Sequence, residues 1–393
     1  MRTAYLEQDP VRGRRLAQQN GEWCVVQNPP AMPLSEREMD EVYDLPYQRA
    51  WHPSYDSEGG VPALHEVRFS IVSHRGCFGE CSFCAIASHA GRIIQRRSDA
   101  SILREAASFA SLPGFKGIIH DVGGPTANFH RPACDMQLSR GACRGRACLA
   151  PDPCGRLVAD QGAYIALLRK IRAIPGIRRV FIRSGIRYDY LLLAHDDFLE
   201  ELCRHHVSGQ LKVAPEHAVP HVTRLMGKPG IETYLCFAEK FRRMNERLGK
   251  RQYLVPYLMS SHPGATLADA VALAEFIRDM GHRPEQVQDF IPTPGTLATC
   301  MYHTGIHPLT GEEVYVARSP EEKRMQRALM QYWLPGNRDT VRMALRLAHR
   351  EDLIGHGRRC IVTSEEDADA GAGEGARRTK PSRAGRRQGK GRR

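Results

Sequence analysis

The chain has 393 residues, which is enough for two or three modest domains or for one large barrel with extensions. Its 42% hydrophobic and 25% charged residues are ordinary for a globular protein and exclude a largely disordered or fibrous chain. The net charge of +12 belongs mainly to residues 377–393, which hold nine basic and no acidic residues and leave a net +3 elsewhere, so the charge says little about the folded body.

The first half of the chain begins with a segment of weak periodicity. Residues 1–65 are rich in Pro, Arg and acidic residues and are predicted to be a linker or wrapping segment. Alternating hydrophobicity predicts a first strand at 66–73 and a second at 117–122, with a helix capped by Ser98 between them. A cysteine-rich insertion follows at 130–156.

Four further strands are predicted, at 179–184, 210–215, 252–259 and 286–292. Amphipathic helices separate them, marked by Tyr164, Leu167, Leu168 and Ile171, by Phe198, Leu199 and Leu202, by Tyr234, Phe237, Ala238 and Phe241, and by a capping box of Thr266 and Asp269. Six strand–helix units in succession predict an α/β core over 66–300 with a mostly parallel sheet, either open and doubly wound or a partial barrel.

The C-terminal part divides into two regions. Residues 301–363 are predicted to be a helical extension with helices at 319–333 and 337–349, the second capped by Asn337. Residues 364–393 are of low complexity, and we expect a disordered basic tail that contacts RNA non-specifically.

Two absences in the sequence predict where the protein resides. No run of 18 apolar residues occurs, and the first residues lack the apolar core of a signal peptide. We therefore expect a cytoplasmic protein without a membrane partner. Its twelve cysteines then do not suggest a disulfide framework.

A group of three cysteines follows the first predicted strand. Cys77, Cys81 and Cys84 have the spacing C-x3-C-x2-C, and Gly76 and Gly79 would let the loop wrap closely around a bound group. Parallel β/α folds place their chemistry in such loops at the carboxyl ends of strands. Cysteine thiolates are the usual ligands of iron–sulfur clusters, and three of them on four irons leave one iron free to bind a small molecule.

Two other interpretations of this loop stay open. The thiols would bind zinc if His74 or His89 completed the ligand set. Alternatively, they would merely fill a tight loop in the core.

The spacing resembles the signature of the radical S-adenosylmethionine (SAM) enzymes. More narrowly, the order of QNPPAMPLS, SHRGCFGECSFCAI, GRIIQRRS, DVGGPTAN, SGIRYD, LKVAPEH, MGKPG, YLVPYLMSSHPG and MYHTG resembles the YgiQ family of radical SAM proteins over residues 1–361. Members of that family usually begin with a further large N-terminal domain. We expect this chain to lack it and to leave an exposed apolar surface where it would pack.

The resemblance implies a fold, cofactors and a reaction. The fold would be a partial (β/α)6 barrel of the radical SAM type, related to the TIM barrel. A [4Fe–4S] cluster would be bound by Cys77, Cys81 and Cys84, with SAM on the free iron. Reductive cleavage of SAM would give methionine and a 5′-deoxyadenosyl radical, which would act on an unknown substrate.

The resemblance also implies contacts to SAM. Phe83 would pack on the adenine, the backbone of Gly123 and Gly124 would meet the methionyl group, and Ser184 and Glu216 would lie beside the ligand at the ends of the third and fourth strands. Pro125 stands where the family's segment has Glu, so only the backbone contact carries over. Arg187 is a further candidate, with an ion pair within its loop as the alternative.

A second group of four cysteines lies in the insertion. Cys134, Cys143, Cys148 and Cys154 are separated by Gly and Pro residues with the spacing C-x8-C-x4-C-x5-C. They are predicted to hold an additional iron–sulfur cluster or a structural zinc. An irregular insertion with reduced thiols is the alternative.

Three functions fit these features. The first is a radical SAM enzyme of unknown substrate that receives its electron from a donor such as a flavodoxin or ferredoxin. The second is an RNA-modifying enzyme similar to the methylthiotransferases, which a second cluster and the basic tail would suit. The third is a non-catalytic nucleic-acid-binding protein with a structural cluster.

Overall fold

The computed structural model describes residues 1–285 and 287–364. The predicted basic tail therefore lies outside the described residues except for Ser364. Within the described part, no helix is both long and apolar enough to cross a membrane.

The elements follow one another in the order that the alternation predicts. The helices are α1 (Arg2–Leu6), α2 (Glu36–Tyr43), α3 (Pro62–Val67), α4 (Ile86–Ala90), α5 (Asp99–Ser108), α6 (Met136–Arg140), α7 (Gly162–Arg172), α8 (Tyr188–Leu192), α9 (Asp197–Glu201), α10 (Pro220–Met226), α11 (Ile231–Leu248), α12 (Leu267–Asp279), α13 (Leu297–Thr304), α14 (Pro320–Met330) and α15 (Arg338–Leu347). The strands are β1 (Leu16–Asn20), β2 (Trp23–Gln27), β3 (Ser70–Val72), β4 (His74–Arg75), β5 (Gln95–Arg96), β6 (Ile118–Ile119), β7 (Asp121–Gly123), β8 (Arg179–Val180), β9 (Gln210–Glu216), β10 (Tyr253–Ser260) and β11 (Val287–Asp289).

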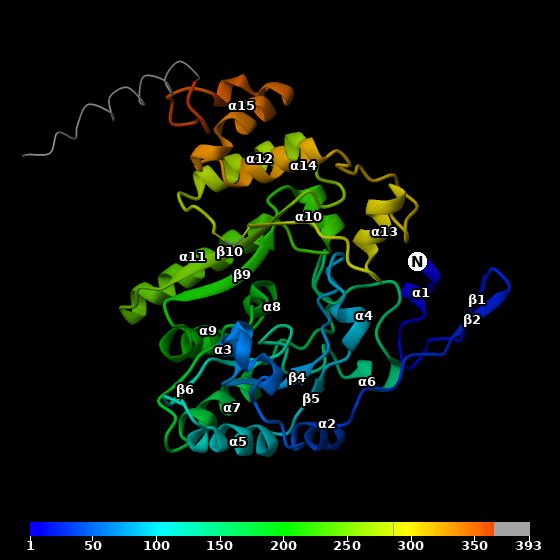
Figure 1. Cartoon of the computed structure of the whole chain (residues 1–393), viewed down its shortest axis with the longest axis vertical. Coiled ribbons are helices and arrows are strands. Elements are labelled where there is room, and N and C mark those ends of the chain that lie inside the picture. The colour runs from blue at the N-terminus through cyan, green and yellow to red at the C-terminus, as the bar shows by residue number, and fades with distance from the viewer. Residues whose placement is uncertain (286, 365–393) are drawn as a thin grey trace, which may run out of the picture.

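All six predicted core strands are present, and they pair in parallel. β3 pairs with β7 and β6 pairs with β8, while β10 lies between β9 and β11. Figure 1 shows β9 and β10 side by side, with α11 along them. This arrangement of parallel strands and outer helices is that of the predicted partial barrel.

The first strand is shorter than the predicted 66–73. Pro62 occupies the first turn of α3, where a missing amide proton costs nothing, and the helix continues to Val67. The strand therefore begins only at Ser70.

The strand ladder is interrupted between β8 and β9. Nδ1 of the buried His206 donates to the carbonyl oxygen of Val180 at 2.7 Å, and the amide of Ile182 donates to the carbonyl oxygen of His206 at 3.0 Å. His206 thus forms the hydrogen bonds along β8 that β9 would otherwise form.

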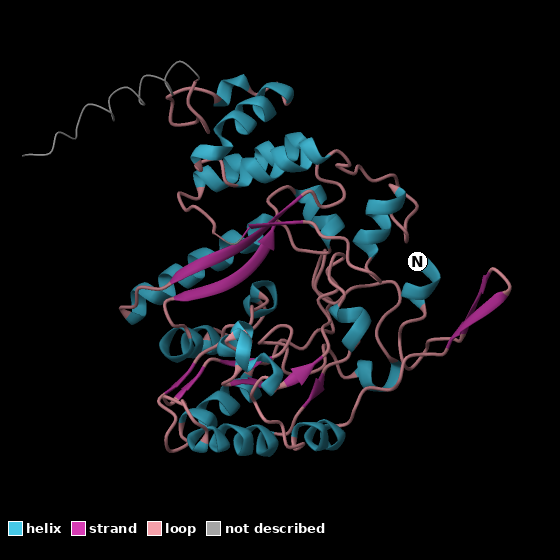
Figure 2. Ribbon diagram, viewed as in Figure 1, coloured by secondary structure: helices cyan, strands magenta, loops and turns pink. Residues whose placement is uncertain are grey.

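Helices surround the parallel strands, as the ribbon in Figure 2 shows. The apolar faces of α5, α7 and α11 meet in one core, which includes Ile102, Leu168 and Phe237. Ser98 caps α5 by accepting a hydrogen bond from the amide of Ser101, as predicted.

The C-terminal helices form a second apolar core. Val271 of α12, Leu329 of α14 and Leu345 of α15 are buried together. The capping box of Thr266 and Asp269 at the start of α12 is present as predicted. Asn337 is the N-cap residue of α15 as predicted, but its side chain makes no capping hydrogen bond.

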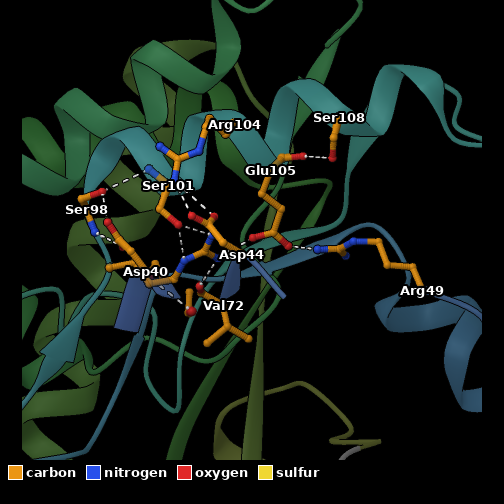
Figure 3. A network of polar contacts seen from close by, with 12 residues as sticks. Asp40, Asp44, Arg49, Val72, Ser98, Ser101, Arg104, Glu105 and Ser108 are labelled. Atoms are coloured by element: carbon orange, nitrogen blue, oxygen red, sulfur yellow. Dashed lines mark hydrogen bonds and ion pairs between the residues drawn. The ribbon is translucent and has the colours of Figure 1, made fainter. Parts of the chain in front are cut away.

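The N-terminal segment is fixed to the core by a polar network (Figure 3). Arg97 is fully buried and pairs with Glu105 of α5, which also pairs with Arg49 of the N-terminal segment. Asp40 of α2 accepts a hydrogen bond from the amide of Ser98 at 2.9 Å. These buried ionic contacts fasten residues 1–65 to the barrel.

The hairpin of β1 and β2 projects from the body in Figure 1. Trp23 is 80% exposed, and Val25 and Val26 are more than half exposed. These side chains form an exposed apolar surface on the hairpin.

Candidate functional site

The three-cysteine loop lies between β4 and α4, beyond the end of the first core strand. Gly76 has φ of +90°, and a Cβ there would collide with the carbonyl oxygen of Ile93. A Cβ on Gly79 would come within 2.5 Å of Nη1 of Arg187. Both glycines are therefore required by close approaches of neighbouring groups to the loop.

Backbone hydrogen bonds from distant segments fix the loop. The amide of Ser82 donates to the carbonyl oxygen of Met226 at 2.9 Å, and the carbonyl oxygen of Ser82 accepts from the amide of Ala298 at 2.9 Å. The amide of Cys77 donates to the carbonyl oxygen of Gly91 at 3.0 Å. The loop is thus held from three sides, as the ligands of a cofactor need to be.

His262 contacts the same loop through the hydroxyl of Ser82. Its Nδ1 lies 2.7 Å from the carbonyl oxygen of Pro263 and must donate to it, so Nε2 is the acceptor for the hydroxyl of Ser82 at 3.2 Å. Burial lowers the pKa of His262 to about 3, which keeps the ring neutral. His262 is therefore a positioning residue for the loop.

All three thiols line one cavity of about 320 Å³. Burial, together with the neighbouring Cys81, raises the pKa of Cys77 to about 11. The other walls are formed by charged, aromatic and backbone groups, among them Phe83, Pro125, Thr126, Arg183, Gly185, Ile186, Arg187, Lys212, Glu216, Lys228 and Tyr257. The cavity thus combines sulfur ligands with groups of both charges.

Arg187 is the buried cation of this cavity. Its Nε donates to Asp189 at 2.8 Å, and its Nη1 lies 3.6 Å from the sulfur of Cys81. Although burial alone would raise it, the pKa of Asp189 is held below its usual value by this ion pair. The guanidinium of Arg187 therefore lies beside the sulfur of Cys81.

Glu216 and Lys228 form a second buried pair, and Glu216 is the last residue of β9. Nζ of Lys228 lies 3.6 Å from Oε1 of Glu216 and donates to the carbonyl oxygen of Ala214 at 2.8 Å. Oε2 of Glu216 is buried and has no partner among the described residues. Burial raises the pKa of Glu216 and outweighs the opposing effect of Lys228.

The structure separates the predicted SAM contacts into two sets. Phe83 and Glu216 line the cavity with the three cysteines. Gly123, Gly124 and Ser184 do not belong to the lining of this cavity, whose walls at those places are formed by the residues that follow them.

The two glycines and the serine instead meet other parts of the protein. A Cβ on Gly124 would lie 2.6 Å from Nε2 of His74, and one on Gly123 would lie 2.7 Å from Oγ of Ser184. The amide of Ser184 donates to Asp121 at 3.0 Å, and its hydroxyl is bound by the same carboxylate. Their predicted contacts with SAM stay predictions.

Lys228 and Tyr257 were missed as site residues by the sequence-based prediction. Both lie in segments that carry the family resemblance, MGKPG and YLVPYLMSSHPG. No local pattern distinguishes them, because α10 brings Lys228 back to the strand end that carries Glu216.

Neither His74 nor His89, the histidines proposed for a zinc site, lines the cavity of the three thiols. His74 is buried, with Nδ1 2.9 Å from the hydroxyl of Ser73 and Nε2 3.1 Å from the carbonyl oxygen of Thr126. In residues 1–285 and 287–364, no three His, Cys, Asp or Glu side chains are grouped to hold a single metal ion. The zinc interpretation of the loop therefore finds no support.

A small aromatic core contacts both the three-cysteine loop and the insertion. Phe78 and Phe129 stack there with ring centroids 3.7 Å apart, and Cys77 and Cys148 both pack against this core. Arg92 links the two cysteine groups, since it pairs with Glu80 and donates to the carbonyl oxygen of Cys143 at 2.7 Å.

Comparisons with known proteins show the family of the chain. Three family models match the chain: radical SAM N-terminal over residues 1–70, the radical SAM superfamily over 71–277, and a domain of unknown function (DUF3362) over 285–392.

Curated relatives match most of this chain. A UPF0313 protein of Clostridium botulinum is 56% identical over 359 residues, which are 91% of this chain and 56% of the relative. A UPF0313 protein of Clostridium perfringens is 54% identical over 390 residues, 98% of this chain and 59% of the relative. The chain thus spans a little over half the length of these relatives.

One solved structure illustrates a distant likeness. The radical SAM methyltransferase TsrM of Kitasatospora setae, solved with tryptophan and a SAM analogue, is 17% identical with a TM-score of 0.39. The match covers 73% of this chain and 47% of TsrM.

Proposed function

Because this chain belongs to the radical SAM superfamily, and within it to the YgiQ family, we propose that it is an enzyme that binds a [4Fe–4S] cluster and reductively cleaves SAM. The observation that carries the proposal is the single cavity shared by Cys77, Cys81 and Cys84. Three thiols and no histidine on one cavity suit a cluster with one free iron rather than a closed zinc site.

The charged walls suit SAM as the ligand of that iron. SAM carries an amine, a carboxylate and a sulfonium, and the cavity offers Glu216 with an unpartnered Oε2 together with the cation Lys228. Phe83 and Tyr257 supply aromatic faces for the adenine. When bound, the cluster supplies the electron that cleaves SAM into methionine and a 5′-deoxyadenosyl radical.

The protein's own residues hold the ligands and limit side reactions. Arg187 lies beside the sulfur of Cys81, and Asp189 keeps the guanidinium in place. Glu216 binds and orients the amine of SAM through Oε2, while Lys228 compensates its charge. Burial of these groups excludes water from the place where a radical would form.

We propose a flavodoxin or ferredoxin as the class of electron donor. The substrate of the radical is left open by this site. The RNA-modifying function and the non-catalytic nucleic-acid-binding function stay predictions. Any turnover of SAM would exclude the non-catalytic function.

The test is the release of 5′-deoxyadenosine from SAM. The full chain is reconstituted with iron and sulfide without oxygen and reduced with dithionite. We expect the product from the wild type and from Cys236→Ala, a control on the exposed face of α11, and none from Cys81→Ala. Cleavage by Cys81→Ala equal to that of the wild type would overturn the proposal.

A further inference from the structure

The proposed reaction makes no use of the four cysteines in the insertion. These four residues nevertheless line one cavity of about 240 Å³: Cys134, Cys143, Cys148 and Cys154. All four are free thiols, so no disulfide explains why they converge. Four thiols that converge on one cavity form a potential ligand set.

The separation of the thiols distinguishes a single ion from a cluster. A zinc ion draws four thiolates to about 2.3 Å from one centre and leaves no space between them. Within the residues that the structure describes, no cysteine group is drawn in so tightly. A four-iron cube takes one thiolate at each corner and holds them farther apart.

The charge around the cavity matches a thiolate-bound cluster. Four arginines line the cavity, namely Arg12, Arg140, Arg146 and Arg156. No Asp or Glu belongs to its lining. A [4Fe–4S] cluster with four thiolates carries a net charge of roughly −2, and guanidinium groups offset such a charge at close range.

The backbone of the insertion is held in shape by the rest of the protein. Arg92 donates to the carbonyl oxygens of Cys143 at 2.7 Å and Arg146 at 3.2 Å. The amide of Cys154 donates to the carbonyl oxygen of Cys148 at 3.0 Å. From the N-terminal segment, Asp9 accepts from the amide of Ala142 at 2.7 Å. Because the contacts from Arg92 and Asp9 come from outside the insertion, they position its loops before any ligand binds.

We propose that Cys134, Cys143, Cys148 and Cys154 bind a second [4Fe–4S] cluster, with one thiolate on each iron. Four thiols lose their protons to solvent as four iron–sulfur bonds form, with two Fe2+, two Fe3+ and four sulfide ions supplied from solution, so that no iron changes its oxidation state. This cluster has no free corner, so it does not bind SAM. The site is distinct from that of the proposed function and does not depend on it.

The experiment measures iron and acid-labile sulfide in two complementary variants of the full chain. In Cys77→Ala/Cys81→Ala/Cys84→Ala, reconstitution is expected to leave about four irons and four sulfides per chain, against about eight of each in the wild type. In Cys134→Ala/Cys143→Ala/Cys148→Ala/Cys154→Ala, about four of each are expected, now in the first loop.

A matched control removes four thiols elsewhere. Cys24, Cys236, Cys300 and Cys360 lie outside both groups, and their joint change to Ala is expected to keep the wild-type iron content. In case the insertion variant fails to fold, the single variant Cys143→Ser changes an exposed ligand, and its altered EPR signal in the background of the triple variant supports the proposal.

Three results would overturn the proposal. They are a triple variant without iron, one that holds one zinc ion in place of iron and sulfide, and a Cys143→Ser change without effect on its EPR signal. Failure of the triple variant to cleave SAM, by contrast, bears only on the proposed function.

Discussion

The two cysteine groups each contact the same aromatic core through one member, Cys77 and Cys148, and differ in what surrounds their sulfur atoms. The cavity of Cys77, Cys81 and Cys84 carries a carboxylate and cations, including Glu216, Lys228 and Arg187. The cavity of the insertion has arginines and no acidic residue in its lining. Mixed charge suits an organic ligand with both charges, whereas positive charge alone suits an anionic cluster.

The number of thiols supports the same division. Three thiols leave one corner of a four-iron cluster open for chemistry, while four thiols close it. The structural and catalytic zinc sites of proteins differ in the same way, by a closed or an open coordination position. The comparison therefore assigns reactivity to the first loop and a closed cluster to the insertion.

The largest effect is expected from Arg187→Ala. The change leaves the Asp189 carboxylate, which is 5% exposed, without its partner, and breaking such a buried pair costs about 3–5 kcal/mol. Denaturant unfolding measures this loss in the free energy of unfolding. Arg183→Ala is the control, because Arg183 is 44% exposed in its pair with Glu66, and about 1 kcal/mol or less is expected. Equal losses in both variants would contradict the buried role of Arg187.

The next effect compares one glycine from each region. In Gly79→Ala the new methyl group meets Nη1 of Arg187, and overpacking of this kind costs about 1–3 kcal/mol. In Gly145→Ala nothing lies within 4 Å of the new group, so the unfolding free energy is expected to stay within about 0.5 kcal/mol. If Gly79→Ala is as stable as Gly145→Ala, the first loop is not tightly enclosed.

Glu216→Gln tests the unpartnered carboxylate oxygen of the first cavity. The amide keeps the shape of Glu216 but loses its charge, so we expect the Kd for SAM to rise about tenfold, which corresponds to about 1.4 kcal/mol. Equilibrium dialysis with the reconstituted protein measures it. Glu66→Gln, at a side chain that is 76% exposed, is the control and should bind like the wild type. An unchanged Kd in Glu216→Gln would remove this residue from the SAM site.

The smallest effect is expected at the support of the loop. Ser82→Ala removes the donor to Nε2 of the buried His262 and should cost about 1 kcal/mol in the free energy of unfolding. The control Ser139→Ala lies on α6 of the insertion and is exposed, so little change is expected. Thermal unfolding that does not separate the two variants would show that His262 needs no partner in the loop.

Local signals in the sequence were sufficient for much of the fold. The caps at Ser98 and Thr266 depend on residues only three positions apart, and both are present as predicted. The order of the strands along the chain also follows from the alternation of apolar and polar residues. Asn337 makes no capping hydrogen bond for a reason outside the local pattern. Its side-chain amide instead donates to the carbonyl oxygen of Gln331 at 2.9 Å.

The site was only partly predictable for a related reason. Cys77, Cys81 and Cys84 lie close together in the sequence, so their spacing reveals the motif. Lys228 reaches the cavity only because α10 brings the chain back to the end of β9. Position 124 is a glycine because a side chain there would collide with His74, which lies fifty residues earlier. Such contacts across the fold leave no periodic signal in the sequence.

The central claim is that the open corner in the first loop binds SAM. The most direct measurement is the EPR spectrum of the reduced, reconstituted protein before and after SAM is added. We predict that SAM changes the spectrum of the wild type and leaves that of the Cys77→Ala/Cys81→Ala/Cys84→Ala variant unchanged. A wild-type protein that carries its full iron content, yet whose spectrum is the same with and without SAM, would contradict the account.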